Sequence, residues 1–246
     1  MSDRITGRNA VLEALKAGRE IEKITVVKGA EGSARQIIAK AKDKKIPLYY
    51  SDRSRMDKEA GGTNHQGVIA LVSDYRYCSV EEILQRAEER QEPPFVIILD
   101  GVEDPHNLGA VMRTAECAGA HGIIIPKRRA VGITEVVTKT SAGAAEHILC
   151  ARVTNIGATL DQLKAKGLWI GACDMGGPDY FKQDLTGSLG LVIGGEGEGI
   201  GRLVKEKCDF VVSIPMMGRI SSLNAANAAS ILMYEVVRQR MNNGTR

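Results

Sequence analysis

The sequence predicts an α/β protein in two parts, of which the larger, C-terminal part contains a parallel sheet. From Phe95 onward, short apolar runs alternate with helical patterns. The first of these runs, FVIILD, is apolar almost throughout, as is typical of strands buried on both faces of a parallel sheet. A weaker alternation precedes it and ends near Asp74. Strands that alternate with helices favour a parallel sheet covered by helices on both faces.

Residues 1–75 predict a small α/β domain. GRNAVLEALKAG places Val11 and Leu15 one helical turn apart, so it predicts a helix. SARQIIAKAKDKK predicts a second helix, capped by Ser33. The segments KITVVK, IPLYY and GVIALVSD predict strands.

Residues 76–94 are expected to link the two parts. Ser79 is a predicted cap for a charged helix, and Pro93 and Pro94 would stop that helix. The predicted domain boundaries are therefore 1–75, a linker at 76–94, and 95–246.

The second part continues the alternation to its end. Predicted strands after FVIILD are GIIIP, LCARV, LWIGACD, LGLVIGG and DFVVSIP. Predicted helices are NLGAVMRTAECAG, TEVVTKTSAGAAEH, NIGATLDQLKAKG and a last helix in ISSLNAANAASILMYE. We expect this last helix to begin near Ser221 or Ser222, with Asn224 and Asn227 on one side of it.

Composition excludes several classes of protein. No apolar run is long enough to span a membrane, and the N-terminal MSDRITGRNA lacks the apolar stretch of a signal peptide. The five cysteines contain no CxxC pair, and the four histidines are scattered, so we expect reduced thiols, no metal site and a cytoplasmic protein. Residues 1–75 hold 14 Lys and Arg against 10 Asp and Glu, and this mildly basic balance suits contact with phosphates or an ordinary solvated surface.

The glycine-rich segment GGEGEGIG, residues 194–201, follows a predicted strand. It fails the dinucleotide fingerprint because Ile200 stands where the last glycine should be, and no Lys-Ser/Thr completes a P-loop. Ionised Glu196 and Glu198 would repel a pyrophosphate. The segment therefore suits a cationic or hydroxyl-rich ligand such as S-adenosylmethionine, or is simply a tight turn.

Two more segments are candidates for a site. In LDGVEDPHNLGAVMRTAE, Asn107 is a candidate helix cap, and Arg113 lies about two turns further on, where it could equally be an exposed helix arginine. This segment follows a strand of a parallel sheet, at the edge where α/β folds bind ligands. In SIPMMGRISSLNAANAAS, a run of alanines would allow a flat ligand or another backbone to approach closely.

Together, DPHNLGAVMRTA, LVIGGEGEGI and IPMMGRISSLNAANAAS resemble, in order, the three motifs of the SpoU (TrmH) family of SPOUT RNA 2′-O-methyltransferases. The N-terminal segment from GRNAVLEAL to HQGVIALVSDY resembles the L30e-like substrate-binding domain of that family. The resemblance is closest to the RlmB-type 23S rRNA (guanosine-2′-O-)methyltransferases. It implies a deep trefoil knot in the C-terminal domain, which pattern analysis alone would not predict.

The resemblance also implies site residues and partners. The implied catalytic set is Asn107, Arg113, Glu196, Ser222 and Asn224. The implied contacts to S-adenosylmethionine are Thr140, Ser141, Gly194, Glu196, Ile214, Met216 and Leu223. The implied substrate is a guanosine ribose in 23S rRNA, and the implied assembly is a homodimer with neither DNA nor a membrane as partner.

Some alternatives remain open at this level. The substrate could be tRNA, or the chain could be a non-catalytic RNA-binding protein of ribosome assembly. A nucleotide-dependent oxidoreductase is disfavoured by the failed fingerprint. Asn227 stands where the family often has valine, and it has no implied role.

Overall fold

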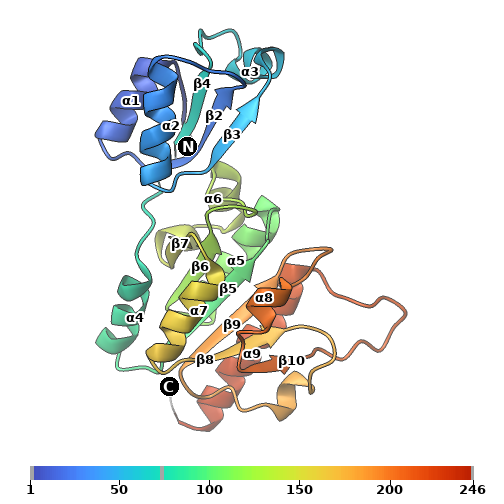
Figure 1. The fold of residues 1–246 in the computed structure, drawn as a ribbon. Helices are drawn as coiled ribbons and strands as arrows, with labels where there is room; N and C mark the ends of the chain where they lie inside the picture. Colours follow the sequence, from blue (N-terminus) through green and yellow to red (C-terminus); the bar gives the residue numbers. More distant parts are fainter. Residues whose placement is uncertain (1–2, 73–74, 245–246) are drawn as a thin grey trace. The chain divides into compact units, whose positions relative to one another are not determined.

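The computed structural model describes residues 3–72 and 75–244, and the chain divides into two compact units, Met1–Arg76 and Tyr77–Arg246 (Figure 1). The division after Arg76 falls close to the expected end of the first domain. Residues 77–94 fall within the second unit in this division, and the boundaries expected at 75 and 95 stay a prediction.

Unit 1 is a four-stranded sheet with two helices on one face. Its elements are β1 (Asp3–Thr6), α1 (Arg8–Lys16), β2 (Ile21–Val27), α2 (Ser33–Asp43), β3 (Leu48–Ser51), α3 (Arg53–Ala60) and β4 (Val68–Val72). The sheet order is β1-β4-β2-β3, with β4 antiparallel to both of its neighbours and β2 parallel to β3. The core joins Val11 and Leu15 of α1 and Ile37 of α2 to Ile24 and Val26 of β2.

The sequence patterns missed β1 and α3 in this unit. β1 has only four residues, and its partner β4 lies more than 60 residues further along the chain. Ser33 also differs from its predicted role: it is the first residue of α2, and Gly32 occupies the cap position.

Unit 2 contains a six-stranded, fully parallel sheet in the order β10-β8-β9-β5-β6-β7. Its strands are β5 (Phe95–Asp100), β6 (Gly122–Pro126), β7 (Leu149–Val153), β8 (Trp169–Cys173), β9 (Leu189–Gly194) and β10 (Phe210–Val212). Its helices are α4 (Val80–Glu89), α5 (Pro105–Cys117), α6 (Glu135–Thr140), α7 (Ile156–Ala165), α8 (Arg202–Lys205) and α9 (Ala225–Asn242), with short 3₁₀ turns η1 (Ala144–Glu146) and η2 (Tyr180–Lys182). The predicted helix TEVVTKTSAGAAEH is thus split into α6 and η1, because Ala142 and Gly143 have left-handed backbone angles.

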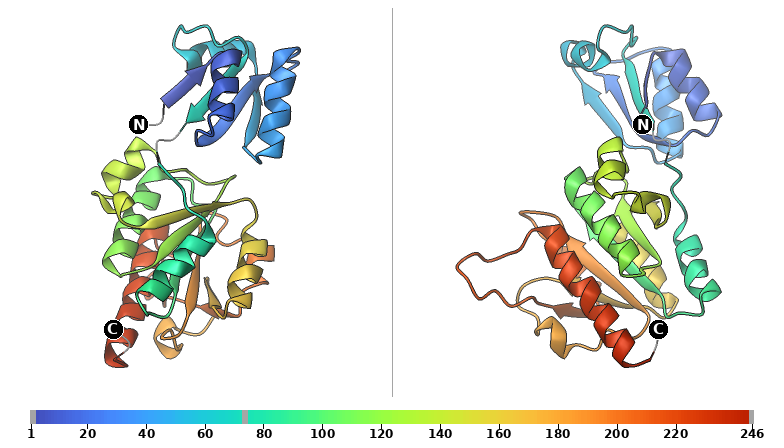
Figure 2. Two further views of the ribbon diagram at one scale, coloured as in Figure 1. Left: turned by 90° about the vertical axis from the view of Figure 1, so that its left-hand side faces the viewer. Right: turned by 180° about the vertical axis from the view of Figure 1, so that it is seen from behind.

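Helices cover both faces of this sheet, as predicted. Val96 and Ile98 of β5 pack in one core with residues of α4 and α7, and α5 and α9 lie together on the opposite face (Figure 2). Successive side chains of a strand point to opposite faces, and all residues from Phe95 to Leu99 are buried. The apolar run FVIILD is one of the two central strands of the sheet, beside β9.

Helix α4 is a structural part of unit 2. Ser79 caps it as predicted, with a capping box in which the Ser79 hydroxyl accepts from the Glu82 backbone N–H. Its Ile83 is fully buried, and a Cβ atom placed on Gly122 of β6 would lie 2.6 Å from the Ile83 side chain. Gly122 therefore allows α4 to lie directly against the sheet.

The C-terminal end of α9 is fixed to the amino-terminal edge of the sheet. Buried Arg240 donates to the carbonyl oxygens of Pro93 (3.0 Å), Pro94 (3.2 Å) and Gly187 (2.7 Å), and its guanidinium lies 5.2 Å from the centroid of the Phe95 ring. These bonds join α9 to the segments that lead into β5 and β9. They fix the helix whose other end carries part of the candidate site.

His121 makes a second buried contact at this edge. Its Nδ1 accepts from the Phe95 backbone N–H (2.9 Å), so the ring proton is on Nε2, which lies 3.1 Å from Glu92 Oε2. Burial lowers the pKa of His121 to about 4, against the opposing effect of the Glu92 carboxylate. The folded state therefore holds this histidine neutral.

We predict that unit 2 loses stability as the pH falls from about 6.5 toward about 4. In this window the unfolded histidine binds a proton that the folded one does not, so stability falls with pH, by at most about 3 kcal/mol for this group. Denaturant titration at several pH values, followed by the fluorescence of the single tryptophan, Trp169, measures it. The His121→Gln protein should have a lower free energy of unfolding at neutral pH, and this free energy should change less as the pH falls. A His147→Gln protein, altered at an exposed histidine, should behave like the wild type. If the free energy of unfolding of His121→Gln depended on pH as steeply as that of the wild type, the assignment would be contradicted.

Candidate functional site

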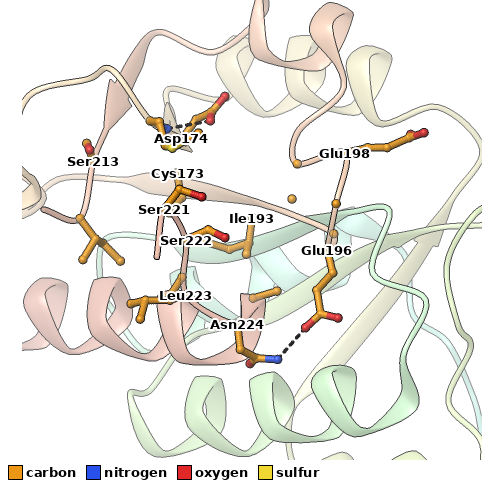
Figure 3. Close-up of a pocket in the computed structure, with 18 of the residues that line it drawn as sticks. Cys173, Asp174, Ile193, Glu196, Glu198, Ser213, Ser221, Ser222, Leu223 and Asn224 are labelled. Carbon is orange, nitrogen blue, oxygen red and sulfur yellow. Dashed lines mark hydrogen bonds between the residues drawn. The ribbon is translucent and has the colours of Figure 1, made fainter. Parts of the chain in front are cut away.

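A pocket of about 670 Å³ opens at the carboxyl edge of the parallel sheet in unit 2 (Figure 3). It is lined by residues from the end of β8 (173–175), from the end of β9 and the glycine-rich loop (193–199), and from the segment between β10 and α9 (213–214, 216 and 221–224), together with Ala225 and Ala228 of α9. Open α/β sheets bind ligands at this edge. The volume is in the range of small-molecule and cofactor sites.

Asn107, Glu196 and Asn224 meet at one side of this pocket. Asn224 Nδ2 donates to Glu196 Oε1 (2.7 Å) and to Asn107 Oδ1 (2.8 Å), and Asn107 Nδ2 donates to the same Glu196 oxygen (3.1 Å). Figure 3 shows the Asn224 amide pointing at the Glu196 carboxylate. The three residues come from the three sequence motifs, so the fold brings together segments that lie up to 117 positions apart.

The other atom of the Asn224 amide forms the cap of α9. Asn224 Oδ1 accepts from the backbone N–H groups of Ala226 (3.0 Å) and Asn227 (3.3 Å). These bonds fix which amide atom is the oxygen. The prediction that the last helix begins near Ser221 or Ser222 is therefore wrong: α9 begins at Ala225, and the two serines lie in the preceding loop.

Asn107 also differs from its predicted role. The cap of α5 is Asp104, whose carboxylate accepts from the His106 N–H, and Pro105 occupies the first helical position. Asn107 lies inside the first turn and is only 7% exposed. Because Asp104 already caps the helix, the Asn107 side chain is left to donate to Glu196.

The glycine-rich loop is held against the end of β5. Asp100 accepts from Gly195 N through its backbone oxygen (2.8 Å) and from Gly201 N through its carboxylate (2.9 Å). A Cβ atom on Gly195 would lie 2.0 Å from the backbone oxygen of Gly101, so no other residue fits there. The close approach fixes the position of Glu196, the next residue.

Two members of the predicted catalytic set, Arg113 and Ser222, do not join this cluster, and Arg113 also lies outside the pocket. Arg113 is an exposed residue of α5, and it makes no hydrogen bond or ion pair within the described residues 3–72 and 75–244. Ser222, by contrast, lines the pocket from the loop before α9.

Five of the seven predicted cofactor residues line the pocket, namely Gly194, Glu196, Ile214, Met216 and Leu223. Thr140 and Ser141 do not. Thr140 Oγ1 donates to Val136 O (2.8 Å), and the buried Ser141 hydroxyl donates to Thr138 O (2.8 Å). Both hydroxyls are used within the turns of α6, so any contact of this segment with a ligand would involve its backbone or a rearrangement.

The sequence predicted β8 as a strand, but it did not indicate that the residues at the end of this strand belong to the site. Cys173, Asp174 and Met175 line the pocket opposite Glu196, and Asp174 pairs with Lys205 at 2.6 Å. The position of β8 as a predicted parallel strand could have indicated them, because ligands bind at the carboxyl ends of such strands. Burial raises the pKa of Cys173 to about 11, so its thiol stays protonated and is no nucleophile at neutral pH.

The lining has a consistent chemical character. It combines apolar side chains, such as those of Ile193 and Leu223, with three carboxylates, Asp174, Glu196 and Glu198. Within the described part of the chain, no group of three or more His, Cys, Asp or Glu residues could hold a metal ion. The same part contains no helix that is both long and apolar enough to cross a bilayer. The pocket fits an organic ligand with apolar, cationic and hydroxyl groups better than a polyanion.

The chain belongs to the SpoU rRNA methylase family, whose model matches residues 94–234. A second model, described as an RNA 2′-O ribose methyltransferase substrate-binding domain, matches residues 4–78. These matches confirm the predicted family and, with the parallel sheet, the predicted SPOUT-type α/β domain. The trefoil knot and the L30e-like character of unit 1 stay predictions.

Individual relatives agree with this placement. A Bacillus subtilis (strain 168) protein, YacO, which its name places in the TrmH family of tRNA/rRNA methyltransferases, is 49% identical over 240 residues, covering 97% of this chain and 96% of its own. Among solved structures, the SpoU methyltransferase AviRb from Streptomyces viridochromogenes in complex with AdoMet has a TM-score of 0.63 at 26% identity, covering 97% of this chain and 90% of AviRb. An AdoMet-bound rRNA methyltransferase from Sinorhizobium meliloti has a TM-score of 0.60 at 26% identity, with coverages of 96% and 87%.

We predict that Asn224 contributes separately to the helix cap and to the site. Asn224→Ala should cost about 1–2 kcal/mol through the cap alone. Asn224→Asp keeps a capping oxygen but replaces the amide donor beside Glu196 with a carboxylate, so it should spare the helix and disrupt the cluster. Thermal unfolding and calorimetric binding of S-adenosylmethionine separate the two effects.

Asn227→Ala is the matched control for this prediction. Asn227 is an exposed residue of α9 whose backbone N–H, rather than its side chain, contacts Asn224. Its replacement should leave both ligand binding and stability nearly unchanged, since alanine is the better helix former. Equal ligand binding by Asn224→Asp and Asn227→Ala would contradict a role of the Asn224 amide in shaping the pocket.

Proposed function

We propose that this protein uses S-adenosylmethionine to methylate the ribose 2′-hydroxyl of a guanosine in 23S rRNA. The observation that carries the proposal is the cluster of Asn107, Glu196 and Asn224 beside the pocket, because it joins all three family motifs at one site. AdoMet-bound relatives with the same fold support the choice of cofactor. We also place the protein in the cytoplasm, where its RNA substrate would be.

The proposed cofactor residues are those that line the pocket. S-adenosylmethionine supplies a methyl group on a sulfonium centre. Leu223, Ile214 and Met216 would pack against its apolar parts. Gly194, which lets the backbone of Gly199 and Ile200 approach closely, would line the site through its own backbone. Thr140 and Ser141, at the end of α6, stay in the proposed set, although they do not line the pocket. Glu196 Oε1 already accepts two amide hydrogens, so its other oxygen is left to accept from a ligand hydroxyl or cation.

The chemistry requires a positioned ribose hydroxyl. In the net reaction, a carbon–oxygen bond forms at the 2′-oxygen, the carbon–sulfur bond breaks, S-adenosylhomocysteine leaves and the hydroxyl proton passes to solvent. In-line placement of the two reactants supplies much of the rate. We propose that Arg113 stabilises the negative charge that develops on the 2′-oxygen, since an arginine remains protonated at neutral pH. Ser222 and Asn224 would orient the substrate and the loop.

We further propose a homodimer in which the site is completed by a second copy. Arg113 does not line the pocket of its own chain. The loop before α9 exposes Met217 (96%) and Ile220 (75%), two apolar side chains beside the pocket-lining residues, which a second copy would cover.

Unit 1 is the proposed recognition domain for RNA. Its match to a substrate-binding model and its net positive charge support this role. The proposed division is therefore a substrate-binding part at 1–75, a connecting segment at 76–94 whose helix packs on unit 2, and a methyltransferase part at 95–246. We also retain the knot for this last part.

The direct test is transfer of labelled methyl groups to RNA. The purified protein should label unmodified 23S rRNA on a guanosine 2′-oxygen, and unmodified bulk tRNA should remain unlabelled. Label on tRNA alone would move the assignment to a tRNA ribose methyltransferase. Binding of S-adenosylmethionine without transfer to either RNA would refute the enzymatic proposal for these substrates and favour a role in RNA binding.

We predict that Arg113→Ala abolishes methyl transfer while the affinity for S-adenosylmethionine changes little. The reason is that Arg113 lies outside the pocket but is assigned to the reacting oxygen. Single-turnover assays and calorimetry measure the two quantities. A fully active Arg113→Ala protein would remove the residue from the mechanism.

Co-expression tests whether Arg113 acts across a dimer. Arg113→Ala and Glu196→Ala proteins are each expected to be inactive, but a heterodimer of the two would contain one intact composite site. Random pairing should then restore about one quarter of the wild-type activity. No restored activity in isolated heterodimers would show that each site is built from one chain.

A further inference from the structure

The structure assigns a phosphate-binding role to the β6–α6 loop, residues 127–134, which begins with Lys127, Arg128 and Arg129. We propose that this basic loop holds the backbone of the substrate RNA beside the methyl-transfer site. The inference rests on the proposed function and extends it to residues outside the site described above.

The basic loop lies at the same edge of the sheet as the pocket. β6 pairs with β5 in parallel, so the loop leaves the sheet at the carboxyl edge, one strand from the end of β5. The pocket begins at β9, on the other side of β5. Two strand spacings, about 10 Å, therefore separate the strand that leads into the basic loop from the strand that leads into the pocket.

The basic loop is also bonded to the segment that carries Asn107. Val131 N donates to Val102 O at 3.1 Å, and Val102 lies between β5 and α5. At its ends, Lys127 N donates to Val153 O (2.8 Å), and Ile133 N donates to the hydroxyl of Tyr77 (2.7 Å). The backbone of the loop is therefore fixed relative to the site, and a ligand would not have to order it.

The arginine side chains of the basic loop are free to bind an anion. Arg128 and Arg129 are exposed, and neither makes a hydrogen bond or an ion pair with any residue in 3–72 or 75–244. Some exposed arginines do have partners, since Arg202 lies 3.2 Å from Glu206 and Arg35 lies 3.6 Å from Glu31, whereas others, such as Arg113, have none in the described part of the chain. The basic loop differs from these single arginines in that two free guanidinium groups follow one another directly along the chain.

The backbone of Arg129 supports a specific role for this segment. Its φ angle is +56°, in the left-handed region that residues other than glycine rarely adopt. Such conformations persist where the surrounding structure enforces them. This conformation falls in the bend that carries both exposed arginines.

The acids that flank this region along the chain are not paired with the two arginines. Asp104 accepts from the His106 N–H as the cap of α5, Glu135 lies in the first turn of α6, and neither forms an ion pair with Arg128 or Arg129. Guanidinium groups bind phosphate in a bidentate manner, which makes adjacent arginines well suited to an RNA backbone. The expected occupants are phosphates close to the methylated ribose, and not the bases.

The test compares two double variants of the full-length protein. Arg128→Gln/Arg129→Gln removes two positive charges from the basic loop. Arg90→Gln/Lys166→Gln removes two from exposed positions next to the starts of β5 and β8, at the opposite edge of the sheet. Binding of an unmodified 23S rRNA transcript is measured over a series of KCl concentrations, together with S-adenosylmethionine affinity and thermal stability.

Each phosphate contact contributes about 0.7–0.9 to the slope of log affinity against log salt. The loop variant should therefore have a slope smaller by about 1.5 and a raised KM for RNA, with cofactor affinity and stability unchanged. The control variant should match the wild type. An unchanged slope in the loop variant, or an equal loss in the control, would overturn the inference.

The same experiment separates this inference from the proposed function. If the wild type methylates the RNA and the loop variant keeps the wild-type salt slope, only the role of the basic loop fails. If the wild type binds the transcript without methylating it and the loop variant loses slope, the enzymatic proposal fails and the phosphate-binding role stands.

Discussion

The amide of Asn224 is the interaction on which the candidate site depends. Its oxygen caps α9, and its nitrogen donates to both Glu196 and Asn107. One side chain therefore fixes the start of a helix and the orientation of a carboxylate and a second amide. Both polar atoms of that amide have partners. Rotating it would break its bonds to two backbone N–H groups and to the Asn107 oxygen, and would leave Glu196 Oε1 with only the Asn107 amide as a donor. The same group thereby links the stability of α9 to the geometry of the pocket.

Two other contacts make that geometry possible. Asp100 holds both ends of the glycine-rich loop, and Gly195 lets the loop approach β5 closely, so Glu196 is presented at a fixed place. At the far end of α9, Arg240 bonds three carbonyl groups at the opposite edge of the sheet. The helix is thus held at both ends, by a cap that belongs to the site and by a buried guanidinium that does not. A change at Arg240 would reach the pocket only through the position of α9.

Local patterns predicted most of the fold and located the three motifs, because apolar runs and cap residues report burial and helix ends directly. They failed where distant residues decide the outcome. β1 is too short to be recognised without β4 beside it. Ser221, Ser222 and Asn224 are all acceptable caps by type, and Asn224 is selected because only it also reaches Glu196 and Asn107. Asn107 is a good cap by type too, but Asp104 takes that role.

The position of Arg113 follows from the same packing. Helix α5 buries Leu108, Val111 and Met112 against the sheet and its neighbours, so the exposed side of the helix is left to Arg113. An arginine there cannot replace the amide cluster, because Asn107, the member of the cluster on α5, lies earlier in the helix and is buried. The chain therefore separates two kinds of polar group: neutral amides and one carboxylate, bonded to one another beside the pocket, and free guanidinium groups on Arg113 and on the β6–α6 loop. Groups of the first kind keep their shape without a ligand, whereas those of the second kind gain partners only when an anion arrives. Such a division suits a site whose small cofactor enters a preformed pocket and whose large, negatively charged substrate binds over it.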